Sequence, residues 1–249
     1  MDVIVAALRQ QQEELAGIVG LLDPAGLLSP SRCPGWTVAD VLLHLAQTNE
    51  VAVASCQGRL TAAVEGLPAA QDRRSSVDDW AGAWVEAERG DPEAARQRWA
   101  TSAEVQAEAF AACDPADRVQ WVAGDMAARS LATTRLAETW IHTVDAAVAV
   151  GPEPAPTARL GHVARLAWRT VPYALAGGGH EPAGPVAFDL EAPDGTRWAF
   201  GPGDAPTVVR GTAHALCTVA GQRARAADVG LVADGPDADA VLCLVRTFA

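Results

Sequence analysis

One helical stretch, residues 130–145, carries four ionisable side chains on a single face. Glu138 and His142 are four residues apart, Asp145 lies seven residues after Glu138, and Arg135 lies three before it. Positions at these spacings share one side of an α-helix. Alanine, leucine, tryptophan, isoleucine and valine lie between them, with no glycine or proline. A charge buried in such a setting must be paired or must bind a metal ion, because its desolvation alone costs several kcal/mol.

The same face is equally compatible with a solvated surface, since charged side chains are usually exposed. A metal site needs a third ligand from elsewhere, and His44 is the candidate, although a histidine on an apolar helix face can also be a hydrogen-bonded core residue. His44, Glu138 and His142 would form a set of two imidazoles and one carboxylate, which is common at catalytic zinc and leaves one position open. Asp145 would then orient a ligand or act as a base. Arg135 would pair with Glu138 or with a substrate carboxylate.

Hydrophobic periodicity predicts the helices that must position these side chains. The sequence Thr37-Val-Ala-Asp40 has the form of a capping box, so Thr37 should begin the helix that contains His44. Asp91-Pro92 has the form of an N-cap followed by proline in the first turn. The main predicted helices cover residues 3–22, 37–59, 91–112 and 126–150. Four helices with connections of moderate length predict a bundle, whose facing helices can hold a metal ion.

The composition changes after Gly151-Pro152, where glycine and proline become frequent. Asp194-Gly195 is a hairpin turn signal between two segments that alternate like strands. The predicted elements are helices at residues 155–175, 211–225 and 236–248, with strands at residues 186–191, 196–200, 207–210 and 230–233. We therefore expect an α+β protein with two domains, a helix bundle over residues 1–152 and a small α+β domain over residues 153–249.

Composition excludes several classes of protein. The formal net charge of −12 disfavours nucleic acid and anionic membranes as partners, and no apolar run is long enough to span a bilayer. Lysine is absent, which excludes a catalytic Schiff base or a P-loop lysine. The five cysteines are scattered, with no C-x-x-C pair, so neither a disulfide framework nor a cysteine-rich zinc site is indicated. With no signal-peptide pattern, we expect a cytoplasmic protein, as monomer or homodimer.

Two motifs resemble those of a known family. Residues 34–45 (P-G-W-T-V-x-D-V-x-x-H-L) resemble the first-helix motif of the DinB-like metalloenzymes, specifically of the mycothiol-dependent maleylpyruvate isomerase family. Residues 135–145 (R-L-x-E-x-W-x-H-x-x-D) resemble that family's second motif, in the same register. The resemblance implies that His44, Glu138 and His142 bind a divalent metal, usually taken as zinc.

The resemblance extends to the second half of the chain. The Asp194-Gly195 hairpin and the stretch over residues 209–216 (V-R-G-T-A-H-A-L) are similar to the family's sterol-carrier-like C-terminal domain. The implied fold is therefore a DinB-like four-helix bundle followed by a sterol-carrier-like domain, in a branch of mostly unassigned members. Thiol-transferase relatives use three histidines, and Glu138 in place of one of them favours the isomerase side of the superfamily.

The implied function is a metal-dependent, mycothiol-linked isomerase or thiol transferase acting on a small polar or carboxylated substrate. In the isomerase, a mycothiol thiolate on the metal adds to a conjugated double bond, permits rotation and is expelled. Two alternatives remain open. One is a metalloenzyme of secondary metabolism that uses no thiol, such as a hydrolase, lyase or cyclase. The other is a non-catalytic protein that binds an apolar ligand, with structural histidines.

Overall fold

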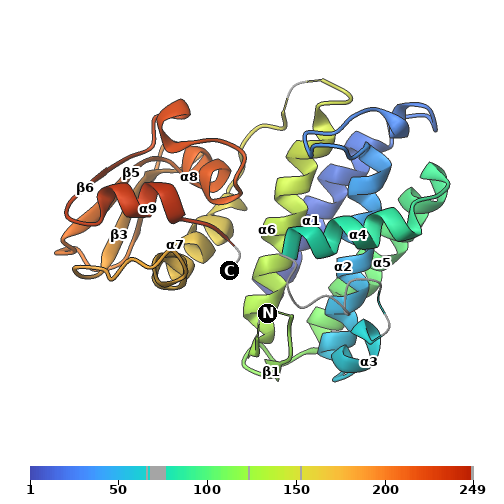
Figure 1. Cartoon of the computed structure of the whole chain (residues 1–249), viewed down its shortest axis with the longest axis horizontal. Coiled ribbons are helices and arrows are strands. Elements are labelled where there is room, and N and C mark those ends of the chain that lie inside the picture. The colour runs from blue at the N-terminus through green and yellow to red at the C-terminus, as the bar shows by residue number, and fades with distance from the viewer. Residues whose placement is uncertain (66, 68–76, 123, 152, 248–249) are drawn as a thin grey trace. The chain divides into compact units, whose positions relative to one another are not determined.

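The computed structural model describes residues 1–65, 67, 77–122, 124–151 and 153–247. The chain divides into two compact units, Met1–Pro154 and Ala155–Ala249. The boundary expected from the sequence falls at residue 152, which lies outside the described residues. The first unit is helical and the second combines helices with a sheet, so the predicted α+β class is confirmed. Figure 1 shows the elements of each unit.

Four long helices build the N-terminal unit. Helices α1 and α2 each pack against both α5 and α6, which gives the predicted bundle. Its helices are α1 (Asp2–Val19), α2 (Val38–Cys56), α3 (Leu60–Val64), α4 (Val77–Glu88), α5 (Pro92–Ala112) and α6 (Ala128–Ala147). The expected loop over residues 66–76 lies, except for residue 67, outside the described residues. No described helix is both long and apolar enough to cross a lipid bilayer.

The start of α2 follows from its first residues. The Thr37 hydroxyl accepts a hydrogen bond from the Asp40 backbone N–H (3.2 Å), and the Asp40 carboxylate accepts one from the Thr37 backbone N–H (2.9 Å). The predicted capping box is confirmed, and it satisfies backbone donors that a helix N-terminus leaves unpaired. Asp91 caps α5 in a similar way, accepting from the Glu93 N–H (3.1 Å). These caps fix where the helices begin.

Helix α6 begins two residues later than the periodicity predicts. Met126 and Ala127 form strand β2 (Met126–Ala127), which pairs antiparallel with β1 (Arg118–Val119). These two residues pair with β1 through their backbone instead of forming the first turn of α6. At the other end, the expected stop at Gly151 is preceded by hydrogen-bonded turns after Ala147. Strands this short carry no readable alternation, so the sequence did not predict them.

A buried polar chain links four helices inside the apolar bundle. Gln11 on α1 donates to the Thr143 hydroxyl on α6 (3.1 Å). Its neighbour Gln12 donates to Gln106 on α5 (3.3 Å), and Gln106 donates to Asn49 on α2 (2.7 Å). Buried amides are costly unless they are paired, so one alignment of the helices is favoured over shifted ones. This alignment also sets the height of α2 against α6.

The C-terminal unit contains a four-stranded sheet with the order β4-β3-β5-β6. Strands β3 (Val186–Glu191) and β4 (Arg197–Phe200) form the predicted hairpin, with Gly195 at a φ of 78° that glycine adopts readily. Strands β3 and β5 pair in parallel, and β5 and β6 antiparallel. The remaining elements are α7 (Leu160–Gly177), β5 (Thr207–Thr212), α8 (Ala213–Ala220), β6 (Val232–Asp234) and α9 (Ala238–Leu244).

Candidate metal centre

Helices α2 and α6 bring the three predicted ligands together. His44 Nε2 lies 3.8 Å from Glu138 Oε2, and His142 Nε2 lies 3.6 Å from the same oxygen. The rings of His44 and His142 meet edge to face, with centroids 5.0 Å apart. Both histidines are buried, while the Glu138 side chain is 24% exposed. The ionisable face of α6 therefore points into the bundle rather than to solvent.

The spacing of these atoms suits a shared cation. Distances of 3.6–3.8 Å are too long for ordinary hydrogen bonds between nitrogen and oxygen. Zinc bound at about 2.0–2.1 Å by tetrahedral ligands would separate the ligand atoms by about 3.4 Å, and the two distances to Glu138 Oε2 exceed this by only a few tenths of an ångström. One ligand atom from each residue lies within 4.8 Å of the others. The arrangement can hold a divalent ion.

The protonation states of His44 and Glu138 favour cation binding. Burial lowers the pKa of His44 to about 4, which leaves a neutral imidazole with a lone pair at pH 7. Burial alone would raise the pKa of Glu138, but the close His142 and His44 imidazoles and the charge of Arg135 hold it well below its ordinary value. Burial also works against charge on His142, yet Asp145, Cys33 and Glu138 raise its pKa well above the ordinary value. His44 and Glu138 are thus in the forms that bind a cation, whereas His142 must give up its Nε2 proton to bind one.

Arg135 lies one turn before Glu138 and is only 2% exposed. Its Nη2 donates to the Thr48 hydroxyl on α2 (2.7 Å), and its Nε has no hydrogen-bond partner among the described residues. Desolvation lowers the pKa of the guanidinium, and the charge of Glu138 opposes that shift. A buried cation next to Glu138 stabilises the ionised carboxylate.

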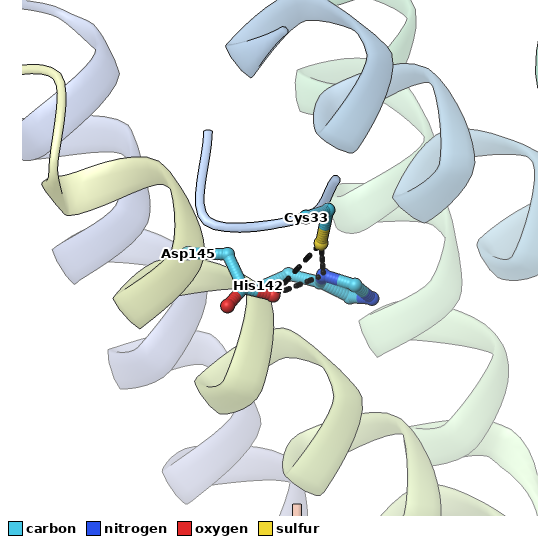
Figure 2. A group of neighbouring side chains, drawn as sticks. All are labelled: Cys33, His142 and Asp145. Atoms are coloured by element: carbon cyan, nitrogen blue, oxygen red, sulfur yellow. Dashed lines mark hydrogen bonds and ion pairs between the residues drawn. The ribbon is translucent and has the colours of Figure 1, made fainter. Parts of the chain in front are cut away.

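Asp145 and Cys33 occupy the opposite edge of the His142 ring, as Figure 2 shows. Asp145 Oδ2 lies 3.0 Å from His142 Nδ1, and the Cys33 thiol donates to the same oxygen over 3.2 Å. Asp145 is completely buried. A histidine whose Nδ1 faces a carboxylate in this way presents Nε2 in a fixed direction. Here that direction is toward Glu138.

The loop before α2 closes one side of the centre. The Trp36 ring lies 5.2 Å from the His44 ring, centroid to centroid. The backbone N–H of Arg32 donates to the Asp145 carbonyl, and the N–H of Ser31 donates to the Trp36 carbonyl. These bonds attach the loop to the end of α6, so Trp36 is held against a candidate ligand.

The residues predicted from the sequence and those found at the centre overlap in part. His44, Glu138 and His142 converge, and Arg135 and Asp145 lie beside them. Cys33 and Thr48 were not predicted to take part. Cys33 directly precedes the P-G-W motif at the start of the helix that carries the candidate ligand His44, and this position is its indication in the sequence. Thr48 follows His44 by one turn of α2.

Residues 8–147 match the family described as the mycothiol maleylpyruvate isomerase N-terminal domain. An uncharacterized protein of Mycobacterium tuberculosis, found in strains CDC 1551 and H37Rv, is 32% identical over 246 residues, which cover 98% of this chain and 95% of the relative.

Two crystal structures share the fold over 95% of each chain. They are the mycothiol-dependent maleylpyruvate isomerase, with a TM-score of 0.62 at 17% identity, and a mutant of that enzyme, with a TM-score of 0.60 at 18% identity. At this level of identity the likeness concerns the fold. The family match covers more than half of the chain, and the chain therefore belongs to the mycothiol maleylpyruvate isomerase family.

Proposed function

We propose that this protein is a metal-dependent, mycothiol-linked isomerase or thiol transferase that acts on a small polar or carboxylated substrate in the cytoplasm. The observation that supports this most directly is the convergence of His44, Glu138 and His142 in a member of this family. Similarity of fold alone would be weak support, because one fold hosts many reactions. The donor set adds chemistry that the fold does not supply.

His44, Glu138 and His142 would hold the metal ion, most suitably zinc, and leave one coordination position open. When bound, the ion would lower the pKa of a thiol in that position, so that a thiolate is present at neutral pH. His44 and Glu138 fit the ion directly, because His44 stays neutral and Glu138 stays ionised at pH 7, and His142 would give up its Nε2 proton on binding.

The surrounding residues would hold the ligands in position. Asp145 would fix the orientation of the His142 ring through Nδ1, which is the usual role of a carboxylate behind a histidine ligand. Arg135 would keep Glu138 ionised and, through its unpaired Nε, offer a donor to an anionic group. Trp36 would keep water away from one side of His44.

A turnover assay tests the proposal. Metal-free protein is supplied with zinc, mycothiol and a maleyl-type acid, and isomerisation or adduct formation is followed by absorbance and mass spectrometry. We expect turnover only when both zinc and the thiol are present. Glu138→Gln keeps the shape of the side chain but removes its charge, so activity at a fixed zinc concentration should fall by at least about 100-fold. This loss is larger than the loss usually caused by replacing a residue that only hydrogen-bonds to a metal ligand.

Glu108→Gln is the matched control, because Glu108 is an exposed acid on α5 and its loss should leave turnover unchanged. Turnover that needs zinc but not the thiol would contradict the mycothiol link and favour a thiol-independent metalloenzyme. A lack of turnover across a panel of electrophilic acids, in protein that does bind zinc, would contradict the proposed reaction class.

A further inference from the structure

A second group of potential ligands lies behind His142. Among the described residues, two groups of three combine histidine, cysteine or acidic side chains with ligand atoms within 4.8 Å of one another. The first is the centre discussed above. The second consists of Cys33, His142 and Asp145 (Figure 2). The two groups share the His142 ring, but the second faces Nδ1, whereas the first faces Nε2.

The second group has a geometry close to that of a coordination shell. Cys33 Sγ lies 3.9 Å from His142 Nδ1 and 3.2 Å from Asp145 Oδ2, and the nitrogen and oxygen are 3.0 Å apart. Zinc ligands at about 2.0 Å for nitrogen and oxygen and about 2.3 Å for sulfur would stand about 3.3–3.6 Å apart in a tetrahedron. Each observed distance differs from this range by a few tenths of an ångström, so small movements suffice.

We propose that Cys33, the Nδ1 atom of His142 and Asp145 form a second site, which binds a soft divalent cation such as zinc. A thiolate favours such ions over magnesium or calcium, which prefer oxygen ligands. Cys33 lies on a loop and is partly exposed, whereas Asp145 and His142 are buried, so the thiol is the side from which an ion enters. The site does not depend on the proposed reaction and shares only His142 with the first group.

Occupation of the second site changes the protonation of its ligands in a defined way. The Cys33 thiol loses its proton to become a thiolate, and His142 loses the Nδ1 proton to bridge the two sites as an imidazolate. An ion at the second site therefore displaces the protons of its own two ligand atoms, Cys33 Sγ and His142 Nδ1. The Cys33 thiolate, the bridging imidazolate and the carboxylates of Glu138 and Asp145 together offset the charge of two divalent cations.

Cobalt(II) titration of metal-free protein under anaerobic conditions tests this inference. Cobalt replaces zinc, and a thiolate ligand adds a charge-transfer band in the near ultraviolet. We expect wild type to bind two equivalents, one of which brings this band. Cys33→Ser should lose the band and that equivalent, but keep the other equivalent. The serine hydroxyl can still donate to Asp145, so the fold should be retained, which circular dichroism checks.

His44→Ala and Cys243→Ser separate the outcomes. His44→Ala should lose one equivalent of cobalt and keep the band. If wild type binds only the ion that brings the band, the second site is supported, whereas the first site and the proposed function are contradicted. Cys243 is exposed and distant in sequence, so Cys243→Ser should change nothing. A single equivalent without the band, or a band that survives Cys33→Ser, would overturn the second site and leave Cys33 as a hydrogen-bond donor only.

Discussion

At the scale of single residues, His142 is the side chain on which the centre depends. One ring nitrogen faces Glu138 and His44, and the other faces Asp145 and Cys33. The four-residue spacing of Glu138 and His142 was enough to predict that they share a face, whereas the role of His44 was implied by the resemblance of residues 34–45 to the family's first-helix motif. Cys33 was not predictable in the same way, because its position depends on the conformation of an irregular loop.

Asp145→Asn tests the role of the carboxylate behind His142. The amide keeps the size of the side chain but is a weaker acceptor for the Nδ1 proton, so the ring should be less well oriented. We expect zinc affinity at the first site to fall by about 10- to 100-fold, the usual effect of removing such a partner. Competition with a chromophoric chelator measures the affinity.

Glu108→Gln is the control for Asp145→Asn, because it removes an equal charge from an exposed position. An Asp145→Asn affinity equal to that of the control would mean that the hydrogen bond to His142 does not help to hold the ion.

At the scale of elements, helix caps mark where α2, which carries the candidate ligand His44, and α5 begin. The capping box at Thr37 could be predicted from a four-residue motif and the N-cap at Asp91 from a two-residue motif, because both depend on local hydrogen bonds. The two-residue ladder of β1 and β2 was not readable, and it displaces the start of α6. The partners in the buried polar chain, such as Gln106 and Asn49, also depend on packing between helices that the sequence does not specify locally.

Thr37→Ala tests the contribution of the cap to the N-terminal unit. The variant removes the acceptor for the Asp40 backbone N–H, and we expect the free energy of unfolding to fall by about 1 kcal/mol. Urea denaturation followed by circular dichroism measures the change. Thr101→Ala, on the exposed side of α5, is the matched control and should change stability by less than about 0.5 kcal/mol. Equal effects of the two substitutions would show that the cap is not a significant source of stability.

At the scale of the whole molecule, the chain consists of a helix bundle that contains the candidate metal centre and an α+β unit that folds around its own sheet. The sequence predicted the hairpin of β3 and β4 from its turn residues. It did not predict that β5 pairs in parallel with β3, because the connection that brings β5 alongside has no local signature. Helix α7 begins at Leu160, five residues later than predicted, after a segment that contains Pro154 and Pro156, and proline disfavours helix in the residue before it.

Asp237 joins separate parts of the C-terminal unit. Its carboxylate is 2% exposed and accepts hydrogen bonds from His180 Nε2 (2.9 Å), the Ala183 N–H (3.1 Å) and the Thr207 hydroxyl (3.3 Å). The bond from His180, with help from the Ala183 N–H, lowers the pKa of Asp237. An acid whose pKa is lower in the folded state stabilises the fold above its unfolded pKa of about 3.9, and this stabilisation is lost as the pH falls.

We therefore expect the C-terminal unit to lose stability as the pH falls from about 5 through the lowered pKa of Asp237. Asp237→Asn should weaken the unit by about 2 kcal/mol at pH 7 and flatten this part of the pH dependence. Hydrogen exchange resolved by segment assigns the loss to residues 155–249. Asp204→Asn, at an exposed position, serves as control. A pH dependence that is the same in Asp237→Asn and in wild type would contradict this role.

The most direct measurement of the central claim is anomalous diffraction at the zinc edge, from crystals of protein purified without chelator and soaked in zinc. The account predicts a peak between α2 and α6, at about 2.0–2.2 Å from His44 Nε2, the Glu138 carboxylate and His142 Nε2. The claim would be contradicted if no anomalous peak appeared at this position and the three side chains were hydrogen-bonded to other protein groups instead.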